Sequence, residues 1–189
     1  MSSLDWKRRL REAAVRLRDH YHAIGLATGA PFLGILYPPD LEVPVLTEWR
    51  AQLGALGSDY EFVEVDALTS TQRVLATIGT AHIVESLADP MPGSDPQADL
   101  AREWIRTVVA DVHQAHDQAK AGRPVVTITR LAALYPAAGP RAVMQELWDS
   151  DQAILERPIV LLIPGSHRGP RTYAFLDLRE ELMYRGDLL

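Results

Sequence analysis

The sequence contains no cysteine, so it offers neither a disulfide framework nor a thiolate metal site. Lysine is almost as scarce, with only Lys7 and Lys120 among 189 residues. No apolar run approaches the roughly 20 residues that span a bilayer. The first residues also lack the apolar stretch of a secretory signal. We therefore expect a cytoplasmic protein in a reducing compartment, with no membrane association.

The shortage of lysine bears directly on nucleotide chemistry. A phosphate-binding loop needs the pattern GxxxxGK[ST], in which backbone N–H groups hold the phosphates and the lysine neutralises them. Neither lysine follows a glycine-rich loop, and the first expected strand leads into YPPDLEVP, whose prolines remove N–H donors. We expect no enzyme activity and no cofactor. A degenerate P-loop-like core, with the sheet kept and the chemistry lost, remains open on fold analogy alone.

The net charge of −6 argues against a general nucleic-acid binder. The charge is uneven, because residues 1–19 carry a net +3 and the rest of the chain carries −9. The basic side chains of this first segment are Lys7, Arg8, Arg9, Arg11, Arg16 and Arg18. They support the hypothesis that the first helix contacts phosphates.

Two apolar runs near the C-terminal end indicate the fold class. Residues 125–128 and 159–163 are almost continuously apolar, which is typical of strands covered on both faces of a parallel sheet. Residues 31–37 and 60–66 are predicted as further strands, and residues 173–178 are a candidate last strand. Helical patterns alternate with these strands. The prediction is a single three-layer α/β domain over residues 1–189, with a mostly parallel sheet flanked by helices.

The helices follow from apolar spacing and capping residues. Residues 1–24 form an expected amphipathic N-terminal helix. Asp66 is expected to cap a helix, and its apolar face is expected to use Leu68, Leu75, Ile78 and Val84. Residues 89–96, DPMPGSDP, are predicted as an internal loop rather than a domain boundary. Asp95 and Pro96 then begin a long helix that runs to about Lys120.

Catalytic and metal-binding patterns are incomplete. His113 and His116 lie three residues apart on the long helix and could reach one metal, but the spacing offers no third ligand. Ser166 and His167 are adjacent, which does not give the geometry of a catalytic triad. Glu180 and Glu181 are interpreted as an exposed charge pair. We therefore predict no catalytic residue and no metal site.

The expected interface lies at the carboxyl ends of the two buried strands, where α/β proteins usually bind ligands and partners. The predicted loop at 164–171 carries His167, Arg168 and Arg171, which could contact an acidic surface or a phosphate. Arg130 ends the other buried strand and would lie close if the strands are neighbours. Tyr135 and Tyr184 are candidate aromatic anchors. A solvated turn and ordinary core packing explain these residues equally well.

Several short motifs carry a family resemblance. They are PFLGILYPP at 31–39, TRLAALYP at 129–136 with the helix after it, the strand ending IPG at 163–165, and the closing FLDLREELMYRGDLL. In order and spacing they resemble the BrxB family, small components of bacterial BREX phage-exclusion systems. The sequence departs from the family pattern at Ile163, where an aromatic residue is more common. It also departs at Tyr184-Arg185, where a longer basic run is common.

The resemblance implies a non-catalytic subunit that assembles with other BREX proteins, particularly the alkaline-phosphatase-like PglZ. Because the rest of the chain carries −9, we expect DNA to be contacted only within the complex, if at all. Two other classes of function remain open. One is a nucleic-acid-binding adaptor that uses the basic first helix, and the other is a cryptic nucleotide-binding enzyme.

Overall fold

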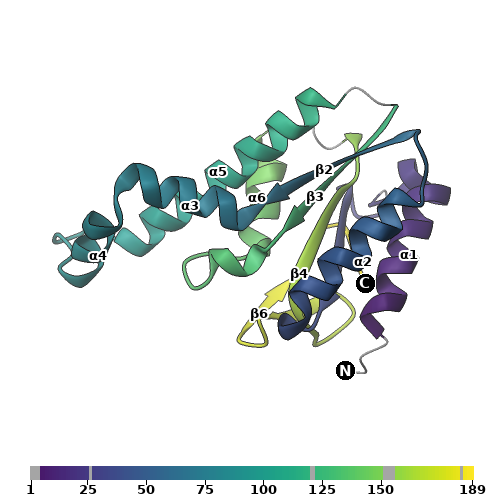
Figure 1. Cartoon of the computed structure of the whole chain (residues 1–189). Helices are drawn as coiled ribbons and strands as arrows, with labels where there is room; N and C mark the ends of the chain where they lie inside the picture. Colours follow the sequence, from purple (N-terminus) through teal and green to yellow (C-terminus); the bar gives the residue numbers. More distant parts are fainter. Residues whose placement is uncertain (1–4, 26, 120–121, 151–155, 184) are drawn as a thin grey trace.

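The computed structural model describes residues 5–25, 27–119, 122–150, 156–183 and 185–189, so the expected anchor Tyr184 lies outside the described residues. A parallel sheet in the order β2-β3-β4-β1-β7 forms the centre, and β5 and β6 extend β4 in antiparallel fashion (Figure 1). The strands are β1 (Phe32–Tyr37), β2 (Tyr60–Asp66), β3 (Arg123–Thr129), β4 (Ile159–His167), β5 (Thr172–Phe175), β6 (Arg179–Leu182) and β7 (Asp187–Leu188). The α-helices are α1 (Asp5–His20), α2 (Glu42–Gly54), α3 (Ala67–Ile78), α4 (Thr80–Ala88), α5 (Pro96–Gln118) and α6 (Pro140–Ser150).

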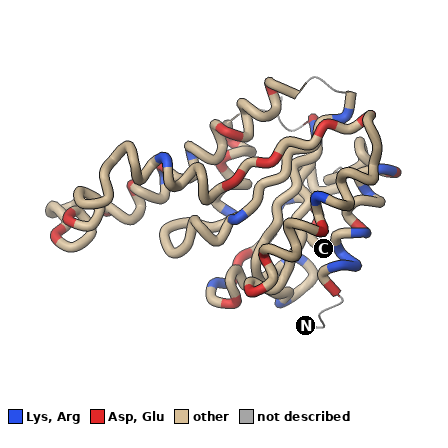
Figure 2. The backbone as a smooth tube through the Cα atoms, in the orientation of Figure 1, with Lys and Arg blue, Asp and Glu red and all other residues tan. Residues whose placement is uncertain are grey.

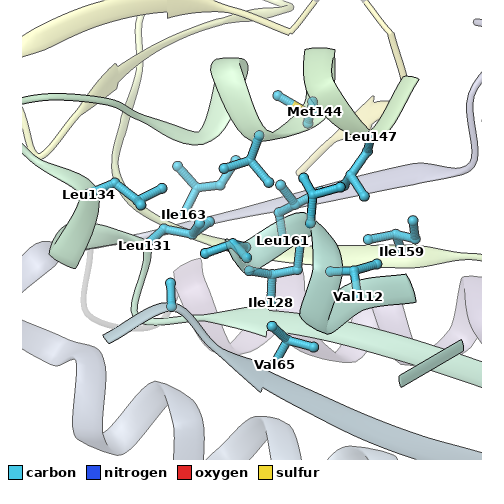
Figure 3. Packing of buried hydrophobic residues seen from close by; sticks show 14 of the residues in the cluster. Val65, Val112, Ile128, Leu131, Leu134, Met144, Leu147, Ile159, Leu161 and Ile163 are labelled. Atoms are coloured by element: carbon cyan, nitrogen blue, oxygen red, sulfur yellow. The ribbon is translucent and has the colours of Figure 1, made fainter. Parts of the chain in front are cut away.

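The two faces of the sheet bury separate apolar clusters. Helices α1 and α2 cover one face, where Leu33 and Leu162 are fully buried. Helices α3, α5 and α6 cover the other face, where Figure 3 shows Ile128 and Leu161 packed against Val112 and Leu147. Successive side chains of a strand point to opposite faces, so a strand with helices on both sides must be apolar at every position. This arrangement confirms the predicted three-layer α/β fold with a mostly parallel sheet.

The order of the strands follows from the handedness of the connections. The chain passes from β1 through α2 to the far edge at β2, and then returns through β3 and β4 until β4 lies beside β1. Connections between parallel strands are almost always right-handed. When the chain reverses the direction in which it adds strands across the sheet, the connecting helices therefore move to the other face. The connections leaving β1 and β4 therefore lie on opposite faces. Their carboxyl ends form the topological switch point of the sheet.

The helix expected after Asp66 differs from the prediction. Asp66 does cap it, because its carboxylate accepts from the backbone N–H groups of Leu68 at 3.0 Å and Thr69 at 3.4 Å. However, α3 ends at Ile78, and α4 begins after Gly79, whose φ of 92° ends the helix. The predicted apolar face is wrong at Leu68, Ile78 and Val84, which are exposed, whereas Leu75 does pack against the core. The residues that α3 fully buries are mostly small, namely Ala67, Ser70, Thr71 and Val74.

The expected loop at 164–171 is wrong in its first half, because β4 continues to His167 and pairs with β5, and the turn comprises residues 168–171. Gly165 allows this continuation, since its α-carbon lies so close to β5 that an added Cβ would be 2.1 Å from the carbonyl oxygen of Ala174. A turn with left-handed Leu176 and Asp177 then leads into β6. We call residues 165–182, which comprise the end of β4 with β5 and β6, the ribbon.

Replacing Gly165 tests the close contact between β4 and β5. We expect Gly165→Ala to destabilise the protein by at least about 2 kcal/mol, because the new methyl group collides with backbone that cannot rotate away. Gly54→Ala is the matched control, since nothing lies within 4 Å of its added Cβ and the residue ends a helix. It should leave stability unchanged or raise it by up to about 1 kcal/mol. Urea unfolding measures both changes, and equal stability of the two variants would contradict the contact.

Candidate functional site

The carboxyl ends of β2 and β3 carry paired charges. Arg50 on α2 donates two hydrogen bonds to the carboxylate of Glu64, at 2.9 and 2.8 Å, and the Thr129 hydroxyl donates a third at 3.1 Å. The hydrogen bonds from Arg50 lower the pKa of Glu64 from its ordinary value, and those from Thr129 act in the same direction. One Nη of Arg130 lies 3.0 Å from a carboxylate oxygen of Asp66. These acids and arginines therefore neutralise one another within the protein.

Arg130 does not lie beside His167 and Arg168, although β3 and β4 are neighbours as the prediction required. The pairing of Ile128 with Leu161 places Arg130 level with Ile163, four residues before His167. At a rise of 3.3 Å per residue this separates them by about 13 Å along the strand. Arg130 also has a left-handed backbone, with φ of 53°, which is uncommon for a residue with a Cβ. Tyr135 follows the short 3₁₀ helix at Leu131–Leu134 and is exposed, as expected of an anchor.

The tip of the ribbon presents His167 and Arg168 to solvent. The backbone is held by hydrogen bonds to the carbonyl of Thr172 from the N–H groups of Arg168 at 2.8 Å and Gly169 at 3.1 Å. Desolvation lowers the pKa of His167 from its ordinary value, and the positive charge of Arg9 lowers it further. The imidazole is therefore mainly neutral at pH 7, and the guanidinium of Arg168 supplies the positive charge at this tip.

Arg171 has a structural role rather than the expected exposed one. Its Nε donates to the carbonyl of Met183 at 2.8 Å, and one Nη lies 3.4 Å from the carbonyl oxygen of Gly186. Its own carbonyl accepts from the Met183 N–H at 2.8 Å. Arg171 thus ties the ribbon to the segment leading into β7.

Glu181 is the main residue of this region that sequence reasoning misinterpreted, because it is buried rather than exposed. Its carboxylate accepts hydrogen bonds from the Tyr173 hydroxyl at 2.7 Å and from the Arg141 N–H at the start of α6 at 3.0 Å. Arg179 adds two more, at 2.7 and 3.0 Å. Burial raises the pKa of Tyr173, and the negative charge of Glu181 adds to this. The network fixes the inner side of the ribbon on α6.

At the switch point, the end of β1 does not resemble a phosphate-binding loop. The Tyr37 hydroxyl donates to Glu42 at 3.1 Å, and Pro38 and Pro39 follow, neither of which has an N–H group. Arg9 of α1 approaches the same strand and donates to the carbonyl of Leu36 at 3.1 Å. The residues that follow β1 supply neither the run of backbone N–H donors nor the lysine that a phosphate-binding loop needs.

The basic first helix is largely occupied by internal ion pairs. Arg9 is buried and pairs with Asp5 at 2.6 Å, so it cannot contact a phosphate, contrary to the expectation for this helix. The other pairs on α1 are Arg8 with Asp5 and Glu12, Arg16 with Glu12 and Asp187, and Arg18 with Asp19. Arg11 is exposed.

Two further expectations concern metals and membranes. His113 lies 3.1 Å from the Ser150 hydroxyl of α6 rather than beside a ligand cluster. Among the described residues, no group of three or more His, Cys, Asp or Glu side chains is arranged to hold a metal ion. Within the same residues, no helix has both the length and the apolar character needed to cross a membrane.

Comparison with known proteins adds no relative, because no family model, no curated protein and no solved structure matches this chain.

The pair between Arg50 and Glu64 predicts a specific pH dependence. The folded-state pKa of Glu64 lies below its ordinary value of 4.5, so the stabilisation is fully present above that pH. It is lost as the pH falls from 4.5 through the lowered folded-state value. We expect Glu64→Gln to cost up to about 1 kcal/mol at pH 7, since the pair is partly exposed.

That cost should shrink towards pH 3, and urea unfolding at the two pH values measures it. The matched control is the same substitution in an Arg50→Gln background, where little pH-dependent difference should remain. A cost of Glu64→Gln that is equal at both pH values would show that Arg50 does not stabilise the carboxylate.

Proposed function

We propose that this chain is a cytoplasmic, non-catalytic subunit of a BREX antiphage system that binds a PglZ-like protein through its ribbon. The proposal joins two independent lines of support. The first is the resemblance of the ordered motifs at 31–39, 129–136 and 163–165 to the BrxB family. The second is the geometry of the ribbon, which is that of a rigid surface rather than of a reaction site.

The observation that carries the proposal is the construction of the ribbon. Its inner side is immobilised by the buried carboxylate of Glu181 and by the hydrogen bonds of Arg171. Its tip exposes Arg168, and Leu182, which pairs with Thr172 beside this tip, is exposed on β6. A fixed backbone reduces the entropy lost on association, and arginine beside apolar side chains is typical of interface hot spots. An acidic partner surface would complement the guanidinium of Arg168.

The two alternatives receive less support. A cryptic nucleotide-binding enzyme would use the carboxyl edge, but Arg50 and Arg130 are paired there with Glu64 and Asp66. A nucleic-acid adaptor would use α1, whose arginines are mostly paired with acids on the same helix. In both alternatives, most of the arginines that would bind phosphates are already engaged in internal ion pairs.

A charge reversal at the ribbon tip tests the proposed contact. We expect a co-expressed PglZ-like protein from the same genome to co-purify with the wild-type chain. Arg168→Glu should weaken this complex at least about tenfold, because an attractive contact with a carboxylate becomes a repulsive one. The melting temperature should remain within about 1 °C of wild type, because an exposed residue is exchanged. Biolayer interferometry measures the affinity.

Arg11→Glu is the matched control, since it makes the same charge change at an exposed position of α1. It should leave the affinity unchanged. An intact complex with Arg168→Glu would remove the ribbon from the interface, and a complex weakened by Arg11→Glu instead would assign the contact to α1. Arg171→Glu does not serve this purpose, because the loss of its hydrogen bonds to Met183 and Gly186 would destabilise the fold.

A further inference from the structure

The connection between β2 and β3 contains a helical arm that projects from the sheet (Figure 1). We define the arm as residues 78–106, which comprise the end of α3, all of α4 and the first half of α5. No residue of α4 is buried, and α5 buries side chains only from Ala101 onwards. Because α4 buries no residue, it gains little from its present packing. A helix of nine residues is also marginal on its own in water.

The arm exposes an unusual share of apolar surface. Ten large apolar side chains are exposed in the described part of the chain, and four of them lie between residues 78 and 91. They are Ile78, Val84, Leu87 and Met91, with exposed fractions of 37%, 60%, 46% and 76%. Single exposed apolar residues are ordinary, whereas a contiguous group marks a binding surface.

Three of these side chains, Ile78, Leu87 and Met91, border a groove between α4 and α5. Ile83, Leu87 and Met91 line it from one side and Leu100 from the other, and its volume is about 480 Å³. Two antiparallel helices with an apolar groove between them are suited to a third helix, whose side chains at i, i+3, i+4 and i+7 fill the groove. The shape therefore favours a helical segment.

The charge of the arm selects among helical segments. Arg102 pairs with Asp99, and Arg106 pairs with Glu103 at 3.1 Å, so both arginines of the arm are neutralised locally. The remaining acids are Glu85, Asp89 and Asp95, and residues 78–106 carry a net charge of −3. Figure 2 shows acidic residues at the outer end of the arm. Of the three remaining acids Asp89 lines the groove, so a groove with apolar side chains on both sides lies within an arm of net negative charge.

We propose that the arm groove is a docking site for a basic amphipathic helix of a partner protein. Apolar side chains of that helix fill the groove, and its lysines or arginines face Asp89 and the net negative charge of the arm. A second copy of the arm fits less well, because two surfaces of net charge −3 repel each other. The site is separate from the ribbon, and the inference does not rest on the proposed BREX function.

The test uses the full-length chain and two fluorescein-labelled peptides of about 18 residues, which make five helical turns. Both carry leucine at i, i+3, i+4 and i+7, and the other positions are lysine in one peptide and glutamate in the other. We expect anisotropy to give a micromolar Kd for the lysine peptide and at least about tenfold weaker binding for the glutamate peptide. Leu87→Gln with Met91→Gln should weaken the lysine peptide at least about tenfold, because both side chains line the groove. Both positions are exposed, so circular dichroism and the melting temperature should match wild type.

Two further variants separate the contributions of shape and charge. Asp89→Asn should reduce the salt dependence of binding, and Val43→Gln, at an exposed apolar residue on α2, should change nothing. Unchanged affinity in the Leu87/Met91 variant would overturn the proposal, as would equal affinity for the two peptides. No binding of the lysine peptide up to about 1 mM protein would also overturn it. Sedimentation showing a dimer that the Leu87/Met91 variant abolishes would assign the groove to a second copy instead.

Discussion

Strand β4 lies between β3 and β1, and its apolar run at 159–163 is buried on both faces. A strand in this position cannot be left with one face in water, so helices must cover the sheet on both sides. The chain meets this requirement by sending α2 across one face and the later helices across the other. The reversal creates the switch point between β1 and β4. The location of the exposed surfaces follows from this one requirement, because only the connections outside the covered sheet remain free to bind partners.

The parallel core could be predicted from the sequence because its signals are local. Continuous apolar runs identified β3 and β4. Asp66 caps α3 and Asp95 caps α5, as predicted. The ribbon could not be recognised in the same way. Its turn uses left-handed Leu176 and Asp177, where glycine or asparagine normally marks such a turn. The end of α3 at Gly79 was missed because the apolar spacing continues through the break, although Leu68, Ile78 and Val84 face solvent.

The candidate site was predictable only in part, because it depends on partners that are distant in the sequence. The exposure of His167 and Arg168 agrees with the interpretation of this segment as a surface. The partner of Arg130 is Asp66, 64 residues earlier, and no local pattern predicts that pair. Glu181 is buried because Tyr173 and the start of α6 converge on it. Residue type and spacing identify charged groups, but only the fold decides which of them neutralise each other.

The ribbon and the arm solve the same physical problem in different ways. Each is an insertion in a connection between strands of the parallel sheet, and each exposes apolar side chains that the core does not need. The ribbon is held to the core by a buried carboxylate and presents the positive charge of Arg168. The arm is held mainly through the buried part of α5 and carries a net charge of −3. The ribbon as a whole has three arginines and three acids, whereas the arm is net acidic, so the two surfaces would favour partners of different charge. The rigid sheet between the two insertions would then set the geometry of the assembly.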